Sequence, residues 1–308
     1  MRKISIPGIY PDFPIEDYFA DPCPEPSLSQ SIAKMLINQS PAHAAWEHPR
    51  LTERARDEDV PTAEQTIGDA VHKLMLGRGK EVAEATFDTW RTGAARKFRI
   101  DTLKLGFVPI LSKHLEKANA IALTANEHLR RLGWMNTIKR HTEVVAVAQE
   151  GPTWLRTLID WIDADKRVVY DIKTLSGSAA PHEIPRTLIG HGWDIQAAFH
   201  ERILDALNPD NAGRREYRYV AIEQDPPHGV CCCILPESVR TIGRKKVDAA
   251  IRVWVDCMKH QRWPAYLGVY FPELLGWAES QWLAREVDAD EAEKKARSQF
   301  DPNVMMAG

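Results

Sequence analysis

The sequence predicts an α/β fold, with a mixed central sheet flanked by helices and a helical lobe on its N-terminal side. Two short runs rich in β-branched and aromatic residues, 154–162 and 168–174, flank the polar connector 163–167, which is typical of a β-hairpin. Helical segments are expected ahead of this hairpin, at 64–76, and after it, at 193–207. Helices before a mixed sheet and a helix crossing it indicate one α/β domain.

The elements before the hairpin begin with an arm at residues 1–26. We expect this arm to be extended, because its many prolines prevent regular helix. A helix capped by Ser27 or Ser29 follows, and the pair Ser40-Pro41 is typical of the start of a second helix. These helices and the one at 64–76 form the predicted N-terminal lobe.

The remaining elements follow from the spacing of apolar residues and from turn residues between them. The further helices are expected at 111–132, 239–259 and 279–300, and the further strands at 142–148, 217–223 and 229–235. The domain organisation that follows is an arm at 1–26, a domain at 27–275 and a charged C-terminal helix and tail at 276–308.

Composition limits the classes of protein that fit. Hydrophobic residues at 44% and charged residues at 27% are ordinary values for a globular chain of 308 residues. The net charge of −3 excludes a uniformly basic nucleic-acid coat, so contact with a nucleic acid would need local basic patches. The sequence lacks an 18-residue apolar run and a secretory leader, and its five cysteines do not suggest a disulfide framework. We therefore expect a cytoplasmic protein without membrane association.

The hairpin carries the residues that could take part in a chemical reaction. Side chains alternate across a strand, so Asp171 and Lys173 share one face. In a regular antiparallel pair of strands, the residue numbers of any two directly opposed residues add up to the same value, which we call the index sum. An odd sum puts Asp160 on that face, and a sum of 331 pairs it with Asp171 and leaves Asp165-Lys166 as a two-residue turn. An even sum without a bulge would separate the two carboxylates.

Two neighbouring carboxylates resist joint ionisation unless a positive charge lies between them. Mg²⁺ prefers oxygen ligands, and it commonly takes one or two carboxylates together with a substrate phosphate. A lysine beside such an ion can orient a bound water, so the pattern predicts phosphodiester hydrolysis. Taken alone, Asp-x-Lys is more typical of a surface charge pair at a strand end.

Other residues admit two interpretations each. His72 shares a helical face with Met75 and Leu76, so it points inward, either as a core histidine or as a metal ligand. The segment 90–99 is the densest basic cluster, and it is equally typical of a solvated helix face and of a DNA contact. Its candidate DNA-binding residues are Arg91, Arg96, Lys97 and Arg99. Arg156 either touches phosphate or forms a structural salt bridge.

Taken together, these motifs resemble the PD-(D/E)xK nuclease superfamily, and within it the RecE-like branch of the exodeoxyribonuclease VIII type. The resemblance covers roughly residues 25–275, in the family's order. The matching segments are Gly68-Asp69-Ala70-Val71-His72, 156–160, Asp171-Ile172-Lys173-Thr174, 192–199 and 219–223. One departure is Trp193, which stands where the family usually has a tyrosine, three residues before Gln196. This departure removes a hydroxyl group and puts a phenolic contact in doubt.

The resemblance implies a PD-(D/E)xK nuclease-like fold and a role for each site residue. It implies that the metal ligands are His72, Asp160, Asp171 and the Ile172 carbonyl, with Glu143 joining directly or through water. It further implies that Lys173 positions the attacking water and that Gln196 steadies it, so the catalytic set is Asp160, Asp171, Lys173 and Gln196. Trp193 would face DNA from the same helix as Gln196. The ion would be Mg²⁺, for which Mn²⁺ can substitute.

The same resemblance implies an exonuclease that resects duplex DNA ends, 5′ to 3′, for single-strand-annealing recombination in a phage or prophage setting. It also implies a homo-oligomeric ring around DNA and a RecT-like annealing protein as partner. Two alternatives remain: an endonuclease or single-strand nuclease of the same superfamily, and a non-catalytic scaffold that binds DNA ends.

Overall fold

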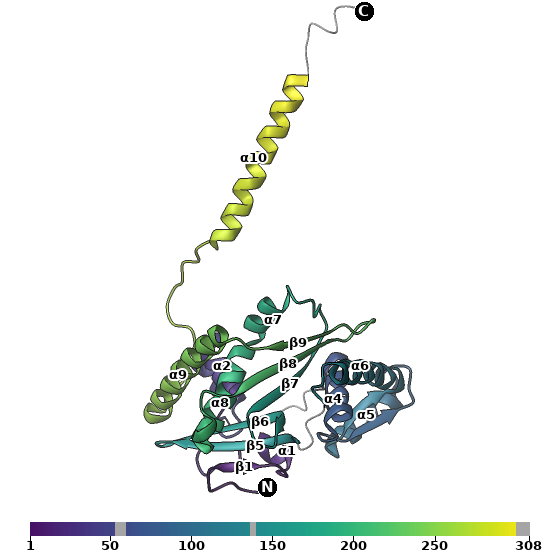
Figure 1. Cartoon of the computed structure of the whole chain (residues 1–308), viewed down its shortest axis with the longest axis vertical. Coiled ribbons are helices and arrows are strands. Elements are labelled where there is room, and N and C mark those ends of the chain that lie inside the picture. Colours follow the sequence, from purple (N-terminus) through teal and green to yellow (C-terminus); the bar gives the residue numbers. More distant parts are fainter. Residues whose placement is uncertain (53–59, 136–139, 300–308) are drawn as a thin grey trace, which may run out of the picture. The chain divides into compact units, whose positions relative to one another are not determined.

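A computed structural model of the chain describes residues 1–52, 60–135 and 140–299 (Figure 1). The chain divides into two compact units, Met1–Ala265 and Tyr266–Gly308. The first unit contains a central mixed sheet flanked by helices, so the predicted fold class is confirmed. The second unit begins ten residues before the predicted C-terminal region at 276–308, and the N-terminal arm belongs to the first unit.

The central sheet has the strand order β1-β5-β6-β7-β8-β9, and the short strand β2 pairs with β6. Pairing is antiparallel between β5, β6 and β7 and parallel between β7 and β8, as a mixed sheet requires. The bounds are β1 Gly8–Tyr10, β2 Leu28–Ser29, β5 Arg140–Glu150, β6 Thr153–Asp163, β7 Val168–Leu175, β8 Glu216–Glu223 and β9 Val230–Ile234.

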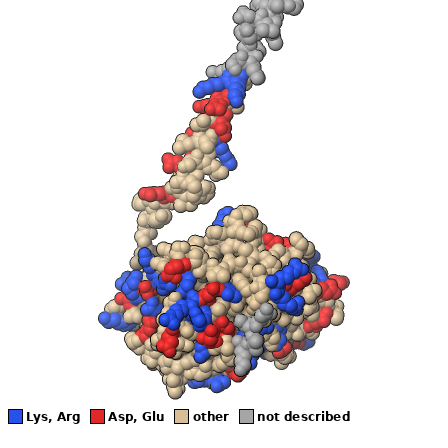
Figure 2. Space-filling view, in the orientation of Figure 1, with Lys and Arg blue, Asp and Glu red and all other residues tan. Residues whose placement is uncertain are grey.

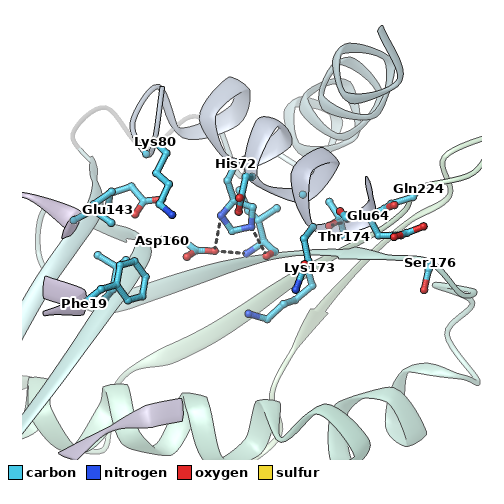
Figure 3. A pocket seen from close by; sticks show the side chains of 17 residues that line it. Phe19, Glu64, His72, Lys80, Glu143, Asp160, Lys173, Thr174, Ser176 and Gln224 are labelled. Atoms are coloured by element: carbon cyan, nitrogen blue, oxygen red, sulfur yellow. Dashed lines mark hydrogen bonds and ion pairs between the residues drawn. The ribbon is translucent and has the colours of Figure 1, made fainter. Parts of the chain in front are cut away.

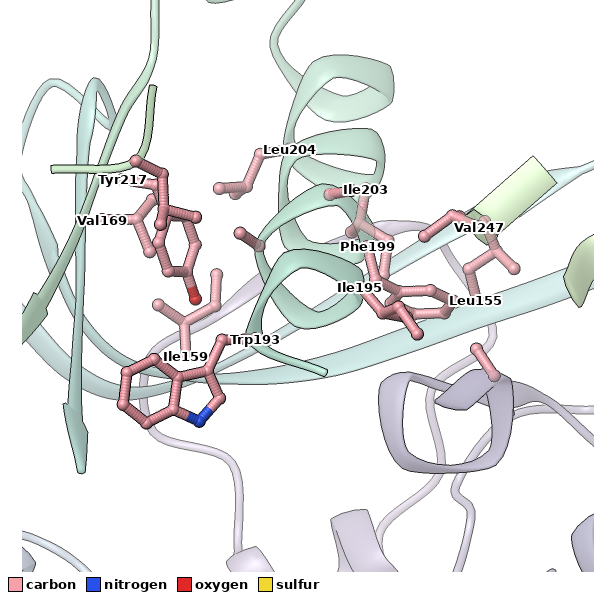
Figure 4. Close-up of a cluster of buried hydrophobic side chains, with 14 of the residues drawn as sticks. Leu155, Ile159, Val169, Trp193, Ile195, Phe199, Ile203, Leu204, Tyr217 and Val247 are labelled. Carbon is pink, nitrogen blue, oxygen red and sulfur yellow. The ribbon is translucent and has the colours of Figure 1, made fainter. Parts of the chain in front are cut away.

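Helices cover both faces of this sheet (Figure 1). One face packs Tyr170 and Ile172 against α4 and α6. The other face carries a cluster in which Leu155 of β6 lies beside Phe199 of α8 and Val247 of α9 (Figure 4). The helices of this unit are α1 Ile15–Phe19, α2 Gln30–Asn38, α3 Pro41–Glu47, α4 Ala63–Leu76, α5 Gly93–Lys104, α6 Ser112–Arg131, α7 Ile184–His191, α8 Trp193–Leu207, the 3-10 helix η1 Pro209–Asn211 and α9 Glu237–His260. A second sheet pairs β3 Val82–Ala85 with β4 Val108–Leu111.

The N-terminal arm differs from the extended segment that its prolines predict. Residues Gly8–Tyr10 form β1, and Gly8 pairs with Val147 at the edge of the central sheet. Pro14 caps α1, where a proline costs little because the first N–H groups of a helix lack intrahelical partners. The expectation of an arm without helix is therefore wrong for residues 15–19.

The hairpin register agrees with the expected index sum, since Trp161 pairs with Tyr170 and Ile162 with Val169, and both sums are 331. The predicted two-residue turn is wrong. The backbone turn instead joins the Lys166 N–H to the Asp163 carbonyl, and the Asp163 carboxylate accepts the N–H groups of Arg167 and Val168. Because this side chain satisfies those donors, the connector is longer than the ideal hairpin turn.

The second unit contains α10, Gly276–Gln299, which is rich in charged residues and also exposes Trp277, Trp282, Leu283 and Val287. Residues 300–308 of the predicted helix and tail lie outside the described residues. Within the described chain, every helix is too short or too polar to span a bilayer. All five cysteines are free thiols.

Candidate active site

A pocket of about 510 Å³ lies between α1, α4 and the ends of β5, β6 and β7 (Figure 3). Its lining includes His72 from the 64–76 helix and Asp160, Ile172 and Lys173 from the hairpin, whereas the predicted site residue Asp171 is not part of the lining. Its polar lining residues include Asp69, His72, Glu143, Asp160 and Lys173. Segments more than one hundred residues apart in the chain therefore converge at one place.

The helix α4 brings His72 to the edge of β7. A capping box between Thr62 and Gln65 fixes its first turn. Gly68 faces β7 so closely that a Cβ atom there would lie 3.0 Å from the Thr174 hydroxyl. Four residues later, the His72 Nε2 atom lies 2.9 Å from the carbonyl oxygen of Ile172. A glycine is needed here because it lets the helix approach the strand.

Asp160 meets the same residue from the other side. Its Oδ2 atom accepts a hydrogen bond from the Ile172 N–H at 2.9 Å and lies 3.7 Å from His72 Nδ1. The Asp160 carboxylate and the His72 imidazole thus converge around one peptide group of β7.

Glu143 completes a group of three with His72 and Asp160, and their ligand atoms lie within 4.8 Å of one another. Glu143 adopts a left-handed conformation, with φ of 52°, inside β5. Its neighbours Thr142 and Val144 pair with Trp161 and Ile159 of β6, so Glu143 lies opposite Asp160. Burial, and next the charge of Asp160, raises the pKa of Glu143 to about 7. Crowded acids of this kind are stabilised by a cation between them.

The donor set fits a divalent ion. An imidazole, two carboxylates and the backbone oxygen of Ile172 offer hard nitrogen and oxygen ligands, and the described part of this pocket contributes no thiol. His72 keeps a lone pair on Nδ1 when it donates from Nε2, so it can serve as a ligand in its neutral form. The position of Glu143 agrees with a direct ligand.

Asp171 lies outside this group of three in the described chain. It is 1% exposed, and it forms an ion pair with Lys173 and accepts a hydrogen bond from Gln196 Nε2 at 2.5 Å. Burial raises the pKa of Asp171, against the effect of the Lys173 charge. The four predicted catalytic residues therefore divide between two sets: Asp160 lies with the predicted metal ligand His72, and Asp171 lies with Lys173 and Gln196.

Two tyrosines of β8 adjoin the second set, and the sequence analysis did not identify them. The Tyr217 hydroxyl lies 3.4 Å from Asp171 Oδ2, and the Tyr219 hydroxyl lies 3.5 Å from Gln196 Oε1. Burial raises the pKa of both phenols well above the usual value, so both remain hydrogen-bond donors. Tyr219 supplies near Gln196 the phenolic group that Trp193 lacks. Tyr217 and Tyr219 lie two residues apart on a predicted strand and therefore share one face, and this was the signal in the sequence that could have identified them.

Two predicted DNA contacts are buried instead. Trp193 is 3% exposed and stacks on Tyr219 with ring centroids 4.8 Å apart. Arg156 is also 3% exposed, and its guanidinium donates to the Ser27 carbonyl and pairs with Asp21. Neither side chain offers a surface to DNA, and for Arg156 the salt-bridge alternative is the one observed.

The basic cluster lies on α5 and the loop before it. Arg91 and Arg96 are exposed, and Lys97 is exposed but paired with Asp101 at 2.7 Å. The Arg99 guanidinium donates to the Pro61 carbonyl and lies 5.0 Å from the Trp90 ring centre. Figure 2 shows basic and acidic side chains intermixed over the visible face, as the net charge of −3 leads us to expect. Any basic contact surface here is local.

A family match places the chain in the PD-(D/E)xK superfamily, a class of enzymes that generally depend on divalent metal ions. The chain belongs to the family described as PDDEXK-like domain of unknown function (DUF3799), whose model matches residues 37–269.

Among solved structures, the chain is similar to a protein from Eubacterium rectale that is named as a candidate exonuclease. The TM-score is 0.50 at 12% identity, over 80% of this chain and 91% of that chain, and this likeness shows the fold alone. A second structure, of the protein SSO0001, has a TM-score of 0.25 at 17% identity, over 67% of this chain and 97% of that chain. No curated protein matches this chain.

Proposed function

We propose that this protein is a divalent-metal-dependent DNA exonuclease that resects duplex ends. The observation that carries the proposal is the convergence of His72, Asp160 and Glu143 within 4.8 Å, in the pocket that Lys173 also lines. An acidic cluster beside an ammonium group matches the need to bind a cation and a phosphate together.

Each residue of the site has its own role in this proposal. His72, Asp160, Glu143 and the Ile172 carbonyl hold Mg²⁺ or Mn²⁺, which when bound activates water and stabilises charge on the phosphate. Asp171 holds the Lys173 ammonium in place through their ion pair, and Gln196 fixes the Asp171 carboxylate by its hydrogen bond. Lys173 then orients the attacking water and offers positive charge to the scissile phosphate.

The resemblance to RecE-like nucleases supports the finer parts of the proposal. These are 5′ to 3′ polarity, a role in single-strand-annealing recombination, a homo-oligomeric ring around DNA and a RecT-like annealing partner. The family match and the fold support a nuclease of this superfamily in general. The mode of cleavage is therefore the part that an experiment must decide.

The test compares linear duplex, closed circular duplex and single-stranded DNA as substrates, each with Mg²⁺, with Mn²⁺ and with a chelator. We expect nucleotide release from linear duplex only, with a divalent ion present. Substitutions Asp160→Asn, Asp171→Ala and Lys173→Ala should each remove the activity, and the exposed control Lys259→Ala should retain it.

Other outcomes would replace the proposal. Cleavage of circular duplex would indicate an endonuclease, and release from single strands alone would indicate a single-strand nuclease. If wild type and Asp171→Ala both bind DNA ends and neither releases nucleotides, the protein is a scaffold. Labelling the 5′ or the 3′ end of the linear substrate gives the polarity.

A further inference from the structure

One wall of the active-site pocket is apolar, although the opposite walls carry charge. It consists of Ile15 and Phe19 from α1 and Leu158 from β6. Phe19 is 52% exposed. In Figure 3 its ring lies at the end of the pocket that Glu143 and Lys80 occupy, beside Asp160, while Ser176 and Gln224 lie at the other end.

The support beneath Phe19 holds it in position. The preceding residue, Tyr18, is 4% exposed and belongs to a buried cluster with Phe13. The rings of Tyr18 and Phe19 meet edge to face, with centroids 5.3 Å apart. Two residues further on, buried Asp21 accepts hydrogen bonds from the Ser27 N–H at 2.9 Å and the Ser27 hydroxyl at 2.6 Å. Phe19 is therefore exposed on a segment anchored on both sides.

We propose that Phe19 is a stacking platform for a nucleobase of the strand whose phosphate enters the pocket. This inference rests on the proposed function and names how the site holds its substrate. A nucleotide with its phosphate at the charged residues must place its base within reach of the pocket wall. An aromatic ring with an open face suits any base, because every base has a π-face.

The position of Phe19 distinguishes it from ordinary exposed apolar residues. Single exposed apolar side chains are common on soluble proteins and need no function. Phe19 instead lines the pocket that contains Asp160 and His72. Because α1 is already anchored, stacking costs little ordering of the protein, which favours binding.

Binding without cleavage provides the first test. A short blunt duplex with 2-aminopurine at its terminal position is titrated with protein in the presence of a chelator, and emission is recorded. Stacking on a ring quenches the probe, so we expect quenching by wild type and by Phe19→Tyr. We expect Phe19→Ala to lose the quenching and to weaken binding of the duplex by about tenfold.

The second test uses turnover and a matched control. Phe19→Ala should raise the KM for linear duplex by about tenfold and leave the unfolding temperature unchanged, because the ring is exposed. The control Phe107→Ala removes another exposed ring, 39% exposed and outside the pocket lining, and should behave as wild type.

Two results would overturn the inference. The first is equal quenching and equal KM in wild type and Phe19→Ala. The second is a change in molar mass of Phe19→Ala by light scattering, which would make Phe19 a contact between copies of the chain. If only this inference is wrong, the wild-type protein is still an active nuclease. If the proposed function is wrong, the wild-type protein has no nuclease activity.

Discussion

The imidazole Nε2 of His72 lies 2.9 Å from the carbonyl oxygen of Ile172, and the N–H of the same Ile172 donates to Asp160 at 2.9 Å. One residue of β7 thus fixes both a helix side chain and a strand side chain. The His72 contact would not form if α4 lay further from the sheet, and His72 would then not reach Asp160. The distance between α4 and β7 is consequently a structural condition for the site.

Gly68 sets that distance, so Gly68→Ala should impair the site. The added Cβ would meet the Thr174 hydroxyl at 3.0 Å, and the helix or the threonine must shift. A displacement of a catalytic group by a fraction of an ångström to one ångström can cost up to about 100-fold in rate, so we expect a loss between about ten- and 100-fold in kcat/KM. Initial rates on linear duplex measure the effect.

The controls for Gly68 separate crowding from helix effects. Adding Thr174→Ala to Gly68→Ala removes the atom that is crowded and should restore much of the activity. Gly93→Ala, in α5, meets no atom within 4 Å and should leave activity unchanged. Full activity of Gly68→Ala alone would contradict the role assigned to this approach.

Divalent ions should stabilise the folded protein, because a ligand that binds only the native state raises its stability, by about 2.7 kcal/mol at one hundred times its Kd. Thermal unfolding with a chelator, with Mg²⁺ and with Mn²⁺ measures this. Asp160→Asn should abolish the ion-induced rise, yet its amide oxygen can still accept from Ile172 N–H, so the metal-free fold should persist. Glu143→Gln should reduce the rise.

The exposed substitution Asp88→Asn serves as the control for charge. It lowers the negative charge by the same amount and should keep the full rise in unfolding temperature. An equal rise in Asp160→Asn and wild type would show that the ion binds elsewhere.

The sequence predicted the parts of the fold that depend on local periodicity. The helix at 193–207 was predicted with its observed bounds, because glycine precedes it and apolar residues follow its turns. Alternation left the hairpin register open between an odd and an even index sum, and the structure has the odd sum of 331. Strands β1 and β2 were missed, because they have three and two residues and depend on pairing with partners more than one hundred residues away.

The sequence predicted which residue types form the site, but it did not predict which of their side chains are buried. Alternation along β6 indicates which way Arg156 points, yet its guanidinium contacts Ser27, Asp21 and the Tyr18 ring, and no local pattern contains these contacts. The same limit applies to Trp193, whose helical face is clear while its stacking on Tyr219 is tertiary. Glu143 lies opposite Asp160 through the pairing of β5 with β6, and the residues next to Glu143 in the sequence do not specify that register.

Acid should destabilise the protein through His48, which is buried and uses both ring nitrogens. Its Nε2 lies 3.0 Å from the Ser27 carbonyl, and its Nδ1 accepts the Arg50 N–H at 3.1 Å. Burial, and next the Arg156 charge, lowers the pKa of His48 to about 4 from 6.5. The unfolded chain therefore binds more protons between these values, and stability falls as pH decreases from about 6.5 toward 4.

The size of this effect approaches about 1.4 kcal/mol per pH unit for each such histidine. Urea unfolding at pH 7.5, 6 and 5 measures it, and His48→Gln should show a shallower dependence. His200, whose pKa burial also lowers to about 4, should retain part of the slope. The exposed control His182→Gln should keep the wild-type slope, and an unchanged slope in His48→Gln would contradict the assignment.

DNA affinity should depend on Arg91 and Arg96, because both are exposed on or beside α5. Each phosphate contact releases a counterion, so the double substitution of both arginines by glutamate should weaken binding and lower the salt dependence of log K by about two. The control double substitution Lys3→Glu with Lys259→Glu changes the net charge equally at two other exposed positions. Binding isotherms at several salt concentrations distinguish the cases. Equal slopes in the two double variants would assign the effect to overall charge and remove α5 from the DNA surface.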